Sequence, residues 1–529
     1  MTLNLDRAIT LHLAGRLAEA EQVYRDALTI DPKAVKALSG LGALLLQTQR
    51  FDEADTYLTA VVALQPDDTD ALNNLGAAAL QGGKFQEARQ CYEKVLVLAP
   101  GHHQAQANLG VALHKLGLFE ESASVFADAT ATDPNNAETH YNASRTYRAL
   151  GRLKDSEAAI RKSLELAPGR HDAWINLGVI QETEARYEEA EKSYRLALNI
   201  DPKAATAHHN LAHVLMQTGQ LGRGWKEFEW RWQTPEFRIA TSFRNLPEWD
   251  GNPLIDGTLL VWAEQGVGDQ ILCAGMFPDL EQAAPNIIVS CSSRLVPLFE
   301  RSFPFARVVA QSGFIRDTKV REIVTAQISV GSLGQFLRPS NESFPNRSTY
   351  LKADANQVQT AKAKYDGIFS TRPRVGVSWR SSNPKSGMSK SLSLQALEPV
   401  IAQGEAAWFD LQYGDTSVQR AAFTDATGLE IYSDPDFDPM TDLDGFAAQI
   451  ASLDLVITVS NSTAHLAGAL GVPCWVLLPT GEGLRWYWFL DRGDSPWYPS
   501  LRLFRQASPG DWASVVQQVK ETHSSFLSS

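Results

Sequence analysis

A proline recurs every 34 residues between Pro32 and Pro202 of this 529-residue chain. The six positions are Pro32, Pro66, Pro100, Pro134, Pro168 and Pro202. A fixed period of this length indicates a repeat architecture and constrains the fold more than any composition value does. Proline lacks a backbone N–H and disfavours helix in the residue before it, so each of these prolines is expected to close a helix. The period therefore predicts a stack of helical repeats.

Small and large residues also recur at fixed positions of the repeat, counted as 34 residues ending two past its proline. Position 8 holds Gly42, Gly76, Gly110 and Gly178; position 20 holds Ala20, Ala54, Ala88, Ser122, Ser156 and Ala190; position 24 holds Tyr24, Tyr92, Phe126 and Tyr194. Small residues let two antiparallel helices approach, and the large residue fills the space beside them. This pattern resembles tetratricopeptide (TPR) repeats over residues 1–236, with Trp174 at their position-4 tryptophan. The resemblance implies a superhelix that binds extended peptides, and hence a protein partner.

Asparagine occupies position 6 of five consecutive repeats, as Asn74, Asn108, Asn142, Asn176 and Asn210. Asparagine is a poor residue for a helix interior, so its recurrence at one phase needs a cause. A side-chain amide both donates and accepts hydrogen bonds, which suits gripping a peptide backbone whatever its sequence. We therefore expect a peptide-binding ladder; the alternative is that the amides cap or bridge neighbouring repeats. The TPR superhelix of O-GlcNAc transferases, which this array resembles, has the same ladder.

Four histidines in the array match no metal-ligand spacing and are expected to be solvated on helix faces: His102, His103, His208 and His209. The four cysteines lie far apart, which excludes a disulfide framework and a cysteine zinc site. The balance of 48 Lys+Arg against 61 Asp+Glu gives a net charge of −13, which argues against nucleic-acid binding. No apolar run is long enough to span a membrane and the N-terminus lacks an export signal, so we expect a cytoplasmic protein.

The second half of the chain changes character, and 12 of the 13 tryptophans lie from Trp225 onward. Trp225, Trp230 and Trp232 are expected to dock the array onto the C-terminal half; a nucleic-acid stacking platform is the alternative that the charge disfavours. Strand-like runs then alternate with helical stretches, which indicates parallel α/β sheets. The runs are residues 258–264, 286–291, 307–310, 374–379, 408–412, 454–460 and 474–479.

A polar stretch at about 338–372 shows few structure signals and separates two groups of strands. We therefore predict an α-solenoid followed by two Rossmann-like lobes. The predicted boundaries are 1–236 for the array, 237–355 for the first lobe, 356–372 for a linker and 373–529 for the second lobe.

Each lobe contains a strand–turn–helix junction where a ligand could bind. In the first lobe, Gly266 and Gly268 allow a tight turn, and Asp269 begins the helix. The alternative for Asp269 is an acid that only interacts with the helix dipole. In the second lobe, a buried strand ends at Ser460, and residues 461–465 open a small-residue helix. Backbone N–H groups at its start, with the hydroxyls of neighbouring residues, predict a cradle for a diphosphate.

The residues of this second junction are Asn461, Ser462, Thr463 and His465. A histidine aimed at a phosphate oxygen stabilises a leaving nucleotide through a charge-assisted hydrogen bond; a buried structural histidine is the alternative. The loop after residues 374–379 adds the cations Arg380, Lys385 and Lys390, for which a solvated basic turn is the alternative.

Most of residues 247–520 resemble the heptosyltransferase-like (family 9) glycosyltransferases, whose two lobes form the GT-B fold. Their G-x-G-D turn is matched by Gly266, Gly268 and Asp269, which implies that Asp269 is the catalytic base. Their second-lobe motif D-T-x-x-x-H-L-A is matched from Ser462 through His465 to Ala467. The chain departs from that motif at Ser460 and Asn461.

The same resemblance implies a lysine near the donor phosphates, matched best by Lys390. The implied donor-binding residues are Gly266, Gly268, Arg380, Lys385, Lys390, Gln412, Asn461, Ser462, Thr463 and His465. GT-B enzymes generally work with a nucleotide-sugar co-substrate and without a resident metal or other cofactor. The one D-x-D, Asp442 to Asp444, precedes a helix and is expected to be an N-cap.

The whole layout resembles bacterial counterparts of O-GlcNAc transferase, which include flagellin glycosyltransferases. It implies an inverting protein O-glycosyltransferase whose Ser/Thr acceptor, with flagellin as the leading candidate, is selected by the array. Two other hypotheses remain open. One is a glycosyltransferase acting on a glycan or lipid with the array as scaffold; the other is a non-catalytic binding protein, for which the departure at Ser460 and Asn461 is the hint.

Overall fold

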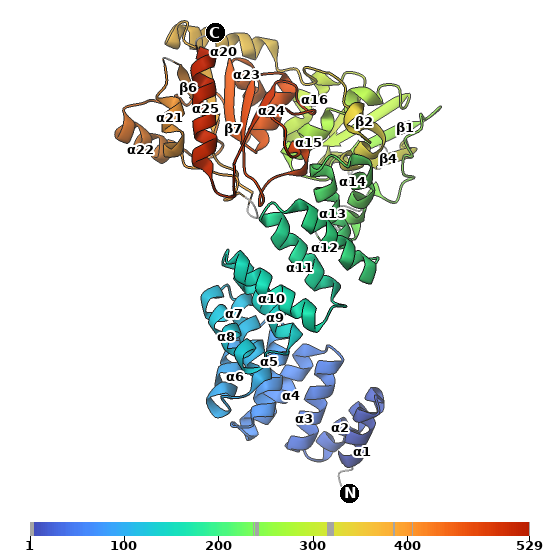
Figure 1. Cartoon of the computed structure of the whole chain (residues 1–529). Helices are drawn as coiled ribbons and strands as arrows, with labels where there is room; N and C mark the ends of the chain where they lie inside the picture. The colour runs from blue at the N-terminus through green and yellow to red at the C-terminus, as the bar shows by residue number, and fades with distance from the viewer. Residues whose placement is uncertain are drawn as a thin grey trace. The chain divides into compact units, whose positions relative to one another are not determined.

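The computed structural model describes residues 5–235, 237, 243–314, 322–383, 387–404 and 406–527. The chain divides into two compact units, Met1–Ile180 and Gln181–Ser529. The first unit is entirely helical, whereas the second contains the end of the helical array and all the strands that the structure describes (Figure 1).

The N-terminal unit is a series of helix pairs whose phase follows the 34-residue period. The helices are α1 (Leu5–Leu13), α2 (Leu17–Ile30), α3 (Val35–Gln47), α4 (Phe51–Leu64), α5 (Thr69–Gln81), α6 (Phe85–Leu98), α7 (His103–Lys115), α8 (Phe119–Thr132), α9 (Ala137–Ala149) and α10 (Leu153–Leu166), with α11 (His171–Thr183) crossing into the second unit. Each periodic proline in this unit lies two residues past the end of a helix, as Pro32 does after Ile30. The predicted solenoid is therefore confirmed.

The position-8 glycines are needed because large side chains of the next helix pack directly against them. A Cβ atom at Gly76 would lie 2.8 Å from Cε1 of Tyr92, and one at Gly110 would lie 2.7 Å from the Phe126 ring. Both rings are fully buried. The predicted pairing of a small residue with a large one thus holds the two helices of these repeats together.

The second unit begins with the last repeats of the array: α12 (Tyr187–Ile200), α13 (Ala205–Gln217), α14 (Leu221–Phe228) and the 3₁₀ helix η1 (Glu229–Gln233). Two of the three predicted docking tryptophans pack on the α/β part. Trp225 donates from Nε1 to the Arg338 carbonyl at 2.8 Å. Trp232 packs against Trp262 with 5.4 Å between the ring centroids. Trp230 instead stacks on His208 within the array.

A buried arginine also joins η1 to the first sheet. The guanidinium of Arg231 is fully buried and lies 2.8 Å from the Glu264 carboxylate, which is also fully buried. Arg231 further donates to the hydroxyls of Ser329 and Ser332 at 2.9 and 2.8 Å. Removing one partner of a buried ion pair leaves an uncompensated charge and costs about 3–5 kcal/mol. This contact makes the last helices of the array structurally part of the α/β unit.

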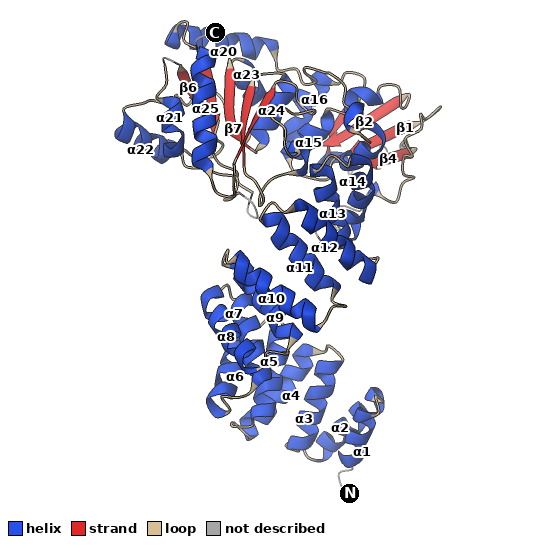
Figure 2. Cartoon of the chain, viewed as in Figure 1, coloured by secondary structure: helices blue, strands red, loops and turns tan. Residues whose placement is uncertain are grey.

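Two separate parallel sheets complete the second unit (Figure 2). The first has the order β3–β2–β1–β4, with β1 (Thr258–Trp262), β2 (Asn286–Cys291), β3 (Arg307–Ala310) and β4 (Ala326–Ser329). The second has the order β6–β5–β7–β8–β9, with β5 (Arg374–Ser378), β6 (Ala407–Asp410), β7 (Leu455–Val459), β8 (Cys474–Leu478) and β9 (Leu501–Arg505). All seven predicted strands are present, and β4 and β9 are additional. The α/β prediction is confirmed.

Helices connect and cover the strands. The main ones are α15 (Val267–Ala274), α16 (Val296–Ser302), α20 (Ala355–Phe369), α21 (Glu398–Ile401), α22 (Ser417–Thr427), α23 (Leu443–Ala451), α24 (Ser462–Leu470) and α25 (Trp512–Leu527). The C-terminal helix α25 lies over the second sheet, where Val515 and Val519 are buried in its core (Figure 1).

The polar stretch at 338–372 is not structure-poor, because α20 occupies much of it. The sequence conceals this helix because only Ala361 and Tyr365 of its residues are buried. Tyr365 anchors it by donating to the Asp434 carboxylate at 2.8 Å and packing on Phe409. Within the part of the chain described, no helix is long and apolar enough to cross a bilayer.

Candidate functional site

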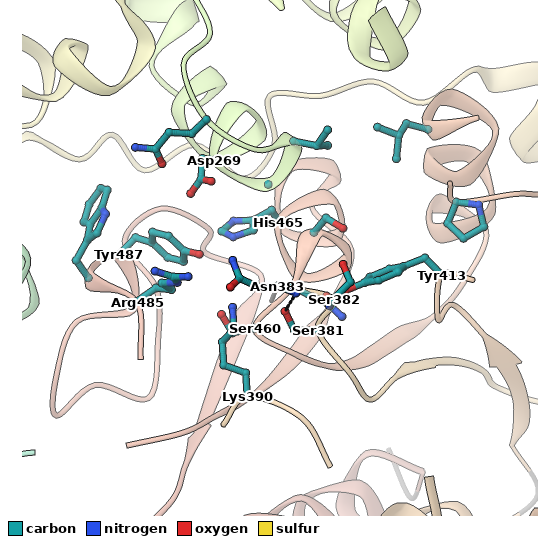
Figure 3. Close-up of a pocket in the computed structure, with 18 of the residues that line it drawn as sticks. Asp269, Ser381, Ser382, Asn383, Lys390, Tyr413, Ser460, His465, Arg485 and Tyr487 are labelled. Atoms are coloured by element: carbon teal, nitrogen blue, oxygen red, sulfur yellow. Dashed lines mark hydrogen bonds between the residues drawn. The ribbon is translucent and has the colours of Figure 1, made fainter. Parts of the chain in front are cut away.

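A cavity of about 590 Å³ lies where both sheets present the carboxyl ends of their strands. The turns that follow β1, β5, β6, β7 and β8 all contribute lining residues. In open parallel sheets this edge is where ligands bind, because strand-to-loop turns and helix N-termini converge there. Figure 3 shows side chains from both lobes converging on this cavity.

Asp269 provides the carboxylate of the site. Gly266 is the N-cap of α15, and Asp269 lies in the first turn of that helix with its side chain lining the cavity. Burial raises the pKa of Asp269, while the nearby charges of Arg485 and Lys390 act in the opposite direction. Gly268 lets the two lobes approach, since a Cβ there would lie 3.1 Å from Cδ2 of His465. Asp269 is thus both a helix-start acid and a cavity residue.

Two cations from the second lobe face this carboxylate. Lys390 is 5% exposed, and burial lowers the pKa of its ammonium to about 8, with Arg485 adding to the effect and Asp269 opposing it. Arg485 lies beyond β8 in a loop that also brings Tyr487 to the cavity (Figure 3). Lys390 was predictable from the sequence, whereas Arg485 and Tyr487 were not predicted. The sequence signal that could have indicated this loop was the pair Gly481 and Gly483, which is followed by a run of aromatic residues.

The second junction is built as a helix cap. The side chain of Asn461 accepts from the backbone N–H groups of Thr463 and Ala464 at 3.0 and 3.3 Å, and its Nδ2 donates to Ser378 Oγ at 2.8 Å. Two of the N–H groups expected to cradle a diphosphate are therefore already satisfied. Ser462 lines the cavity, whereas Thr463 is buried beneath it. The start of α24 therefore offers fewer free N–H groups than the sequence predicts.

His465 lines the cavity and is held from behind by Tyr498, whose hydroxyl lies 2.8 Å from Nδ1. Burial and the charge of Lys390 lower the pKa of His465 to about 3. The ring is therefore neutral at pH 7. A hydrogen bond from it to a phosphate would be neutral, rather than charge-assisted as the sequence suggested.

Of the remaining predicted donor-site residues, Gln412 supports the loop after β5, and Arg380 lies in that loop without lining the cavity. Gln412 Oε1 accepts from the backbone N–H groups of Trp379 and Arg380 at 3.0 and 2.9 Å, so its side chain fixes this loop. Lys385 lies outside the described residues. Three polar residues of the loop line the cavity instead: Ser381, Ser382 and Asn383.

The array itself forms one wall of the cavity, because His209 and His213 of α13 line it. The prediction that His209 is solvated is therefore wrong, and its spacing of four residues from His213 was the signal that both share a helix face. Burial holds the pKa of His213 well below its usual range, with His209 and Arg485 contributing. His208 is also not a solvated residue, since it stacks on Trp230, and His102 accepts from Ala105 N–H as the N-cap of α7.

The five repeated asparagines are each the sixth residue of their helix, in α5, α7, α9, α11 and α13. All five are half-buried. Asn108 accepts from Gln104 at 3.1 Å, and Asn142 donates to Glu138 at 3.0 Å. Both bonds lie within one helix. The side chains of Asn108 and Asn176 also interact with the hydroxyls of Tyr92 and Tyr141 in the preceding repeat, so these two amides bridge neighbouring repeats as the alternative expected.

The D-x-D motif is a helix cap, as predicted. Asp442 accepts from the N–H groups of Asp444 and Gly445 at 3.1 and 2.9 Å at the start of α23. Asp444 pairs with Arg301 of the first lobe. Across the described ranges, no three His, Cys, Asp or Glu side chains are grouped so as to hold a metal ion.

Comparison with known families matches the helical array. Models described as tetratricopeptide repeat match residues 5–26, 40–103, 78–137 and 137–170, and one described as TPR repeat matches residues 186–219. The array is a tetratricopeptide-repeat solenoid.

Among curated proteins, the chain is similar to Protein FlbA of Caulobacter vibrioides, with 32% identity over 333 residues. The match covers 60% of this chain and about half (55%) of FlbA. Because the array ends at Gln233, a match of that extent includes part of the α/β region.

Solved TPR structures resemble the chain over about a third of its length. They include a thermophilic TPR protein of Thermus thermophilus, with 24% identity over 35% of this chain and 100% of that one, at a TM-score of 0.31. YrrB, described as a TPR protein with an unusual peptide-binding site, matches at 20% identity over 35% and 96%, with a TM-score of 0.30. MamA MSR-1 matches at 27% identity over 30% and 92%, with a TM-score of 0.29.

Proposed function

We propose that this chain is a cytoplasmic, inverting protein O-glycosyltransferase of GT-B architecture. It transfers a sugar from a nucleotide-sugar to Ser or Thr of a protein that the array recruits, with flagellin as the leading candidate acceptor. One observation carries the proposal. A cavity at the carboxyl ends of two parallel sheets sets the carboxylate of Asp269 against the cations Lys390 and Arg485. Transfer from a nucleotide-sugar needs a base that takes the proton of the acceptor hydroxyl. It also needs cations on another side of the cavity to bind the diphosphate.

The proposed step is a single displacement at the anomeric carbon. The acceptor hydroxyl oxygen attacks that carbon while the Asp269 carboxylate takes its proton. The bond from the anomeric carbon to the phosphate oxygen breaks on the opposite face, and its electron pair leaves with the nucleotide. Lys390 and Arg485 stabilise the charge that develops there, and Ser462 and neutral His465 offer hydrogen bonds. Lys390 and Arg485 supply the positive charge that the capped start of α24 does not.

Donor binding is tested first, by thermal shift of the full chain with CMP-, UDP-, GDP- and ADP-sugars. At least one is expected to stabilise the protein, because ligand binding to the native state raises its stability. Failure of all four donor classes would contradict the glycosyltransferase proposal and favour a non-catalytic protein.

Transfer is tested by intact-mass analysis of flagellin co-expressed with the wild-type chain or with Asp269→Asn. The wild type should add the mass of a glycosyl residue, and the variant should lose about 10²–10⁴-fold in rate while still binding the donor. A wild type that binds and hydrolyses the donor but leaves flagellin unmodified would point to a different acceptor, such as a glycan or lipid. Transfer by Asp269→Asn at the wild-type rate would remove Asp269 from the role of base.

A further inference from the structure

The loop that carries Arg485 and Tyr487 to the cavity has an unfavourable backbone conformation. In this loop, residues 481–491, Gly481 and Gly483 have φ of 67° and 86°. Phe489 and Asp491 also have positive φ, at 55° and 51°, although neither is glycine. Non-glycine residues in such regions are strained and persist only where the surrounding structure holds them. The 481–491 loop therefore depends on its external contacts.

Several of those contacts come from the last helices of the array. Gln217, the last residue of α13, donates from Nε2 to the Leu484 carbonyl at 3.2 Å. Its own backbone carbonyl accepts from Leu490 N–H at 3.0 Å. One residue thus fixes the loop on both sides of Arg485 and Tyr487.

Other side chains fix the ends and the middle of the loop. The hydroxyl of Tyr187 on α12 accepts from Gly481 N–H at 3.2 Å, and Trp225 meets Trp486 edge to face at 5.2 Å. From the second sheet, Trp488 donates to Ser460 Oγ at 2.8 Å. The Leu484 carbonyl lies next to Arg485 in the chain, so the Gln217 bond fixes the backbone beside the cation.

We infer that Gln217 is a positioning residue that holds Arg485 in the donor cavity. Its side chain is 2% exposed, and it reaches Leu484 from a repeat helix 267 residues earlier in the sequence. The inference rests on the proposed function for the identity of the ligand. The role of Gln217 in holding the 481–491 loop is independent of that function. It makes the last TPR repeat a component of the donor site in addition to any role in recruiting an acceptor.

The first test measures how firmly the loop is held, without any ligand. Gln217→Met keeps the shape of the side chain and removes the donor to Leu484. Gln81 occupies the same repeat position at the end of α5 and is exposed, so Gln81→Met is the matched control. Hydrogen exchange of the full chain should rise about fivefold at residues 484–490 in Gln217→Met, as expected for one lost neutral hydrogen bond, and stay unchanged in the control. Unchanged exchange in Gln217→Met would overturn the inference.

Tyr187→Phe supplies a second variant in case Gln217→Met unfolds. It removes the hydroxyl that accepts from Gly481 N–H and that also interacts with Thr480, and it should raise exchange at residues 481–483. Unchanged exchange there would show that the array does not hold the loop, and the inference would fail.

The second test asks whether Gln217 acts through Arg485. Affinity for UDP, or for whichever of CMP, GDP and ADP binds the wild type, is measured for Gln217→Met, Arg485→Met and the double variant. Gln217→Met alone should weaken binding about fivefold, and it should add nothing in the Arg485→Met background. Additive losses would mean that Gln217 has only a general structural role, which overturns the inference. If no nucleotide binds the wild type, the proposed function fails, and the exchange experiment still decides whether Gln217 holds the loop.

Discussion

Lys390 and Asp269 face the same cavity, and burial moves their pKa values toward each other. The pKa of Asp269 is raised, so a base in this position is ionised above that value and is lost as pH falls through it. The pKa of Lys390 is lowered to about 8, so its charge is present below pH 8 and is lost as pH rises through it. We expect kcat/KM for the donor to be bell-shaped, with its alkaline limb near pH 8.

Lys390→Arg tests the assignment of the alkaline limb. Arginine stays charged at any pH used, so the limb should move to higher pH while the acid limb stays in place. An alkaline limb that remains near pH 8 in this variant would show that another group controls it.

Among the elements, the helix pairs of the array depend on glycines that admit large side chains. Gly76→Ala would place a methyl group 2.8 Å from the buried Tyr92 ring. Overpacking costs about 1–3 kcal/mol, and the better helix propensity of alanine returns about 1 kcal/mol, so the free energy of unfolding should fall by about 1 kcal/mol. Denaturant unfolding measures this change.

Gly101→Ala is the matched control for that experiment, because nothing lies within 4 Å of the Cβ it adds. It should leave stability unchanged or raise it by about 0.4–1 kcal/mol, since alanine restricts the unfolded chain. Equal destabilisation by both substitutions would contradict the packing argument.

The asparagine ladder is the element that should select the acceptor. Asn108→Ala, Asn142→Ala and Asn176→Ala together should leave the helical content intact and reduce modification of a protein acceptor by about tenfold or more, as expected if two or three hydrogen bonds are lost. The control replaces Glu93, Asp128 and Lys162 with alanine on α6, α8 and α10. Normal modification by the folded triple asparagine variant would show that the ladder does not bind the acceptor.

Elements with a strong local signal were predictable from sequence, and those fixed by distant contacts were not. The 34-residue phase predicts the regular helix pairs of the array, and apolar runs predict the central strands. The strand β4 reads Ala-Gln-Ile-Ser and has no such signal, although it is buried against β1. Asn461 was correctly placed at a helix start. Its side chain accepts from the N–H groups that were expected to bind an anion, and the sequence does not show this because it depends on the side-chain rotamer. Arg485 was missed because its position depends on Gln217, 267 residues away from Leu484.

For the whole molecule, the boundary between compact units predicts where the chain can be cut. The fragment 181–529 retains Gln217, Trp225 and Arg231, so it should fold and bind the donor while losing most acceptor modification. A fragment beginning at residue 237 leaves Glu264 buried without Arg231 and should be destabilised by about 3–5 kcal/mol.

Circular dichroism and donor titration of the two fragments check this prediction. A fragment 237–529 that is as stable as 181–529, and that binds the donor equally well, would show that the last repeats are dispensable for the α/β unit.

The buried contacts of η1 and α14 also have a consequence during synthesis on the ribosome. Helix pairs of the first unit contact their neighbours in sequence, so they can fold as they emerge. Trp225, by contrast, must wait for Arg338, which is 113 residues later. At translation rates of about 5–20 residues per second, this indole stays without its acceptor for about 6–23 seconds. A nascent chain of this protein therefore carries a folded repeat array that ends in an exposed aromatic surface, and that surface is where a chaperone would bind it.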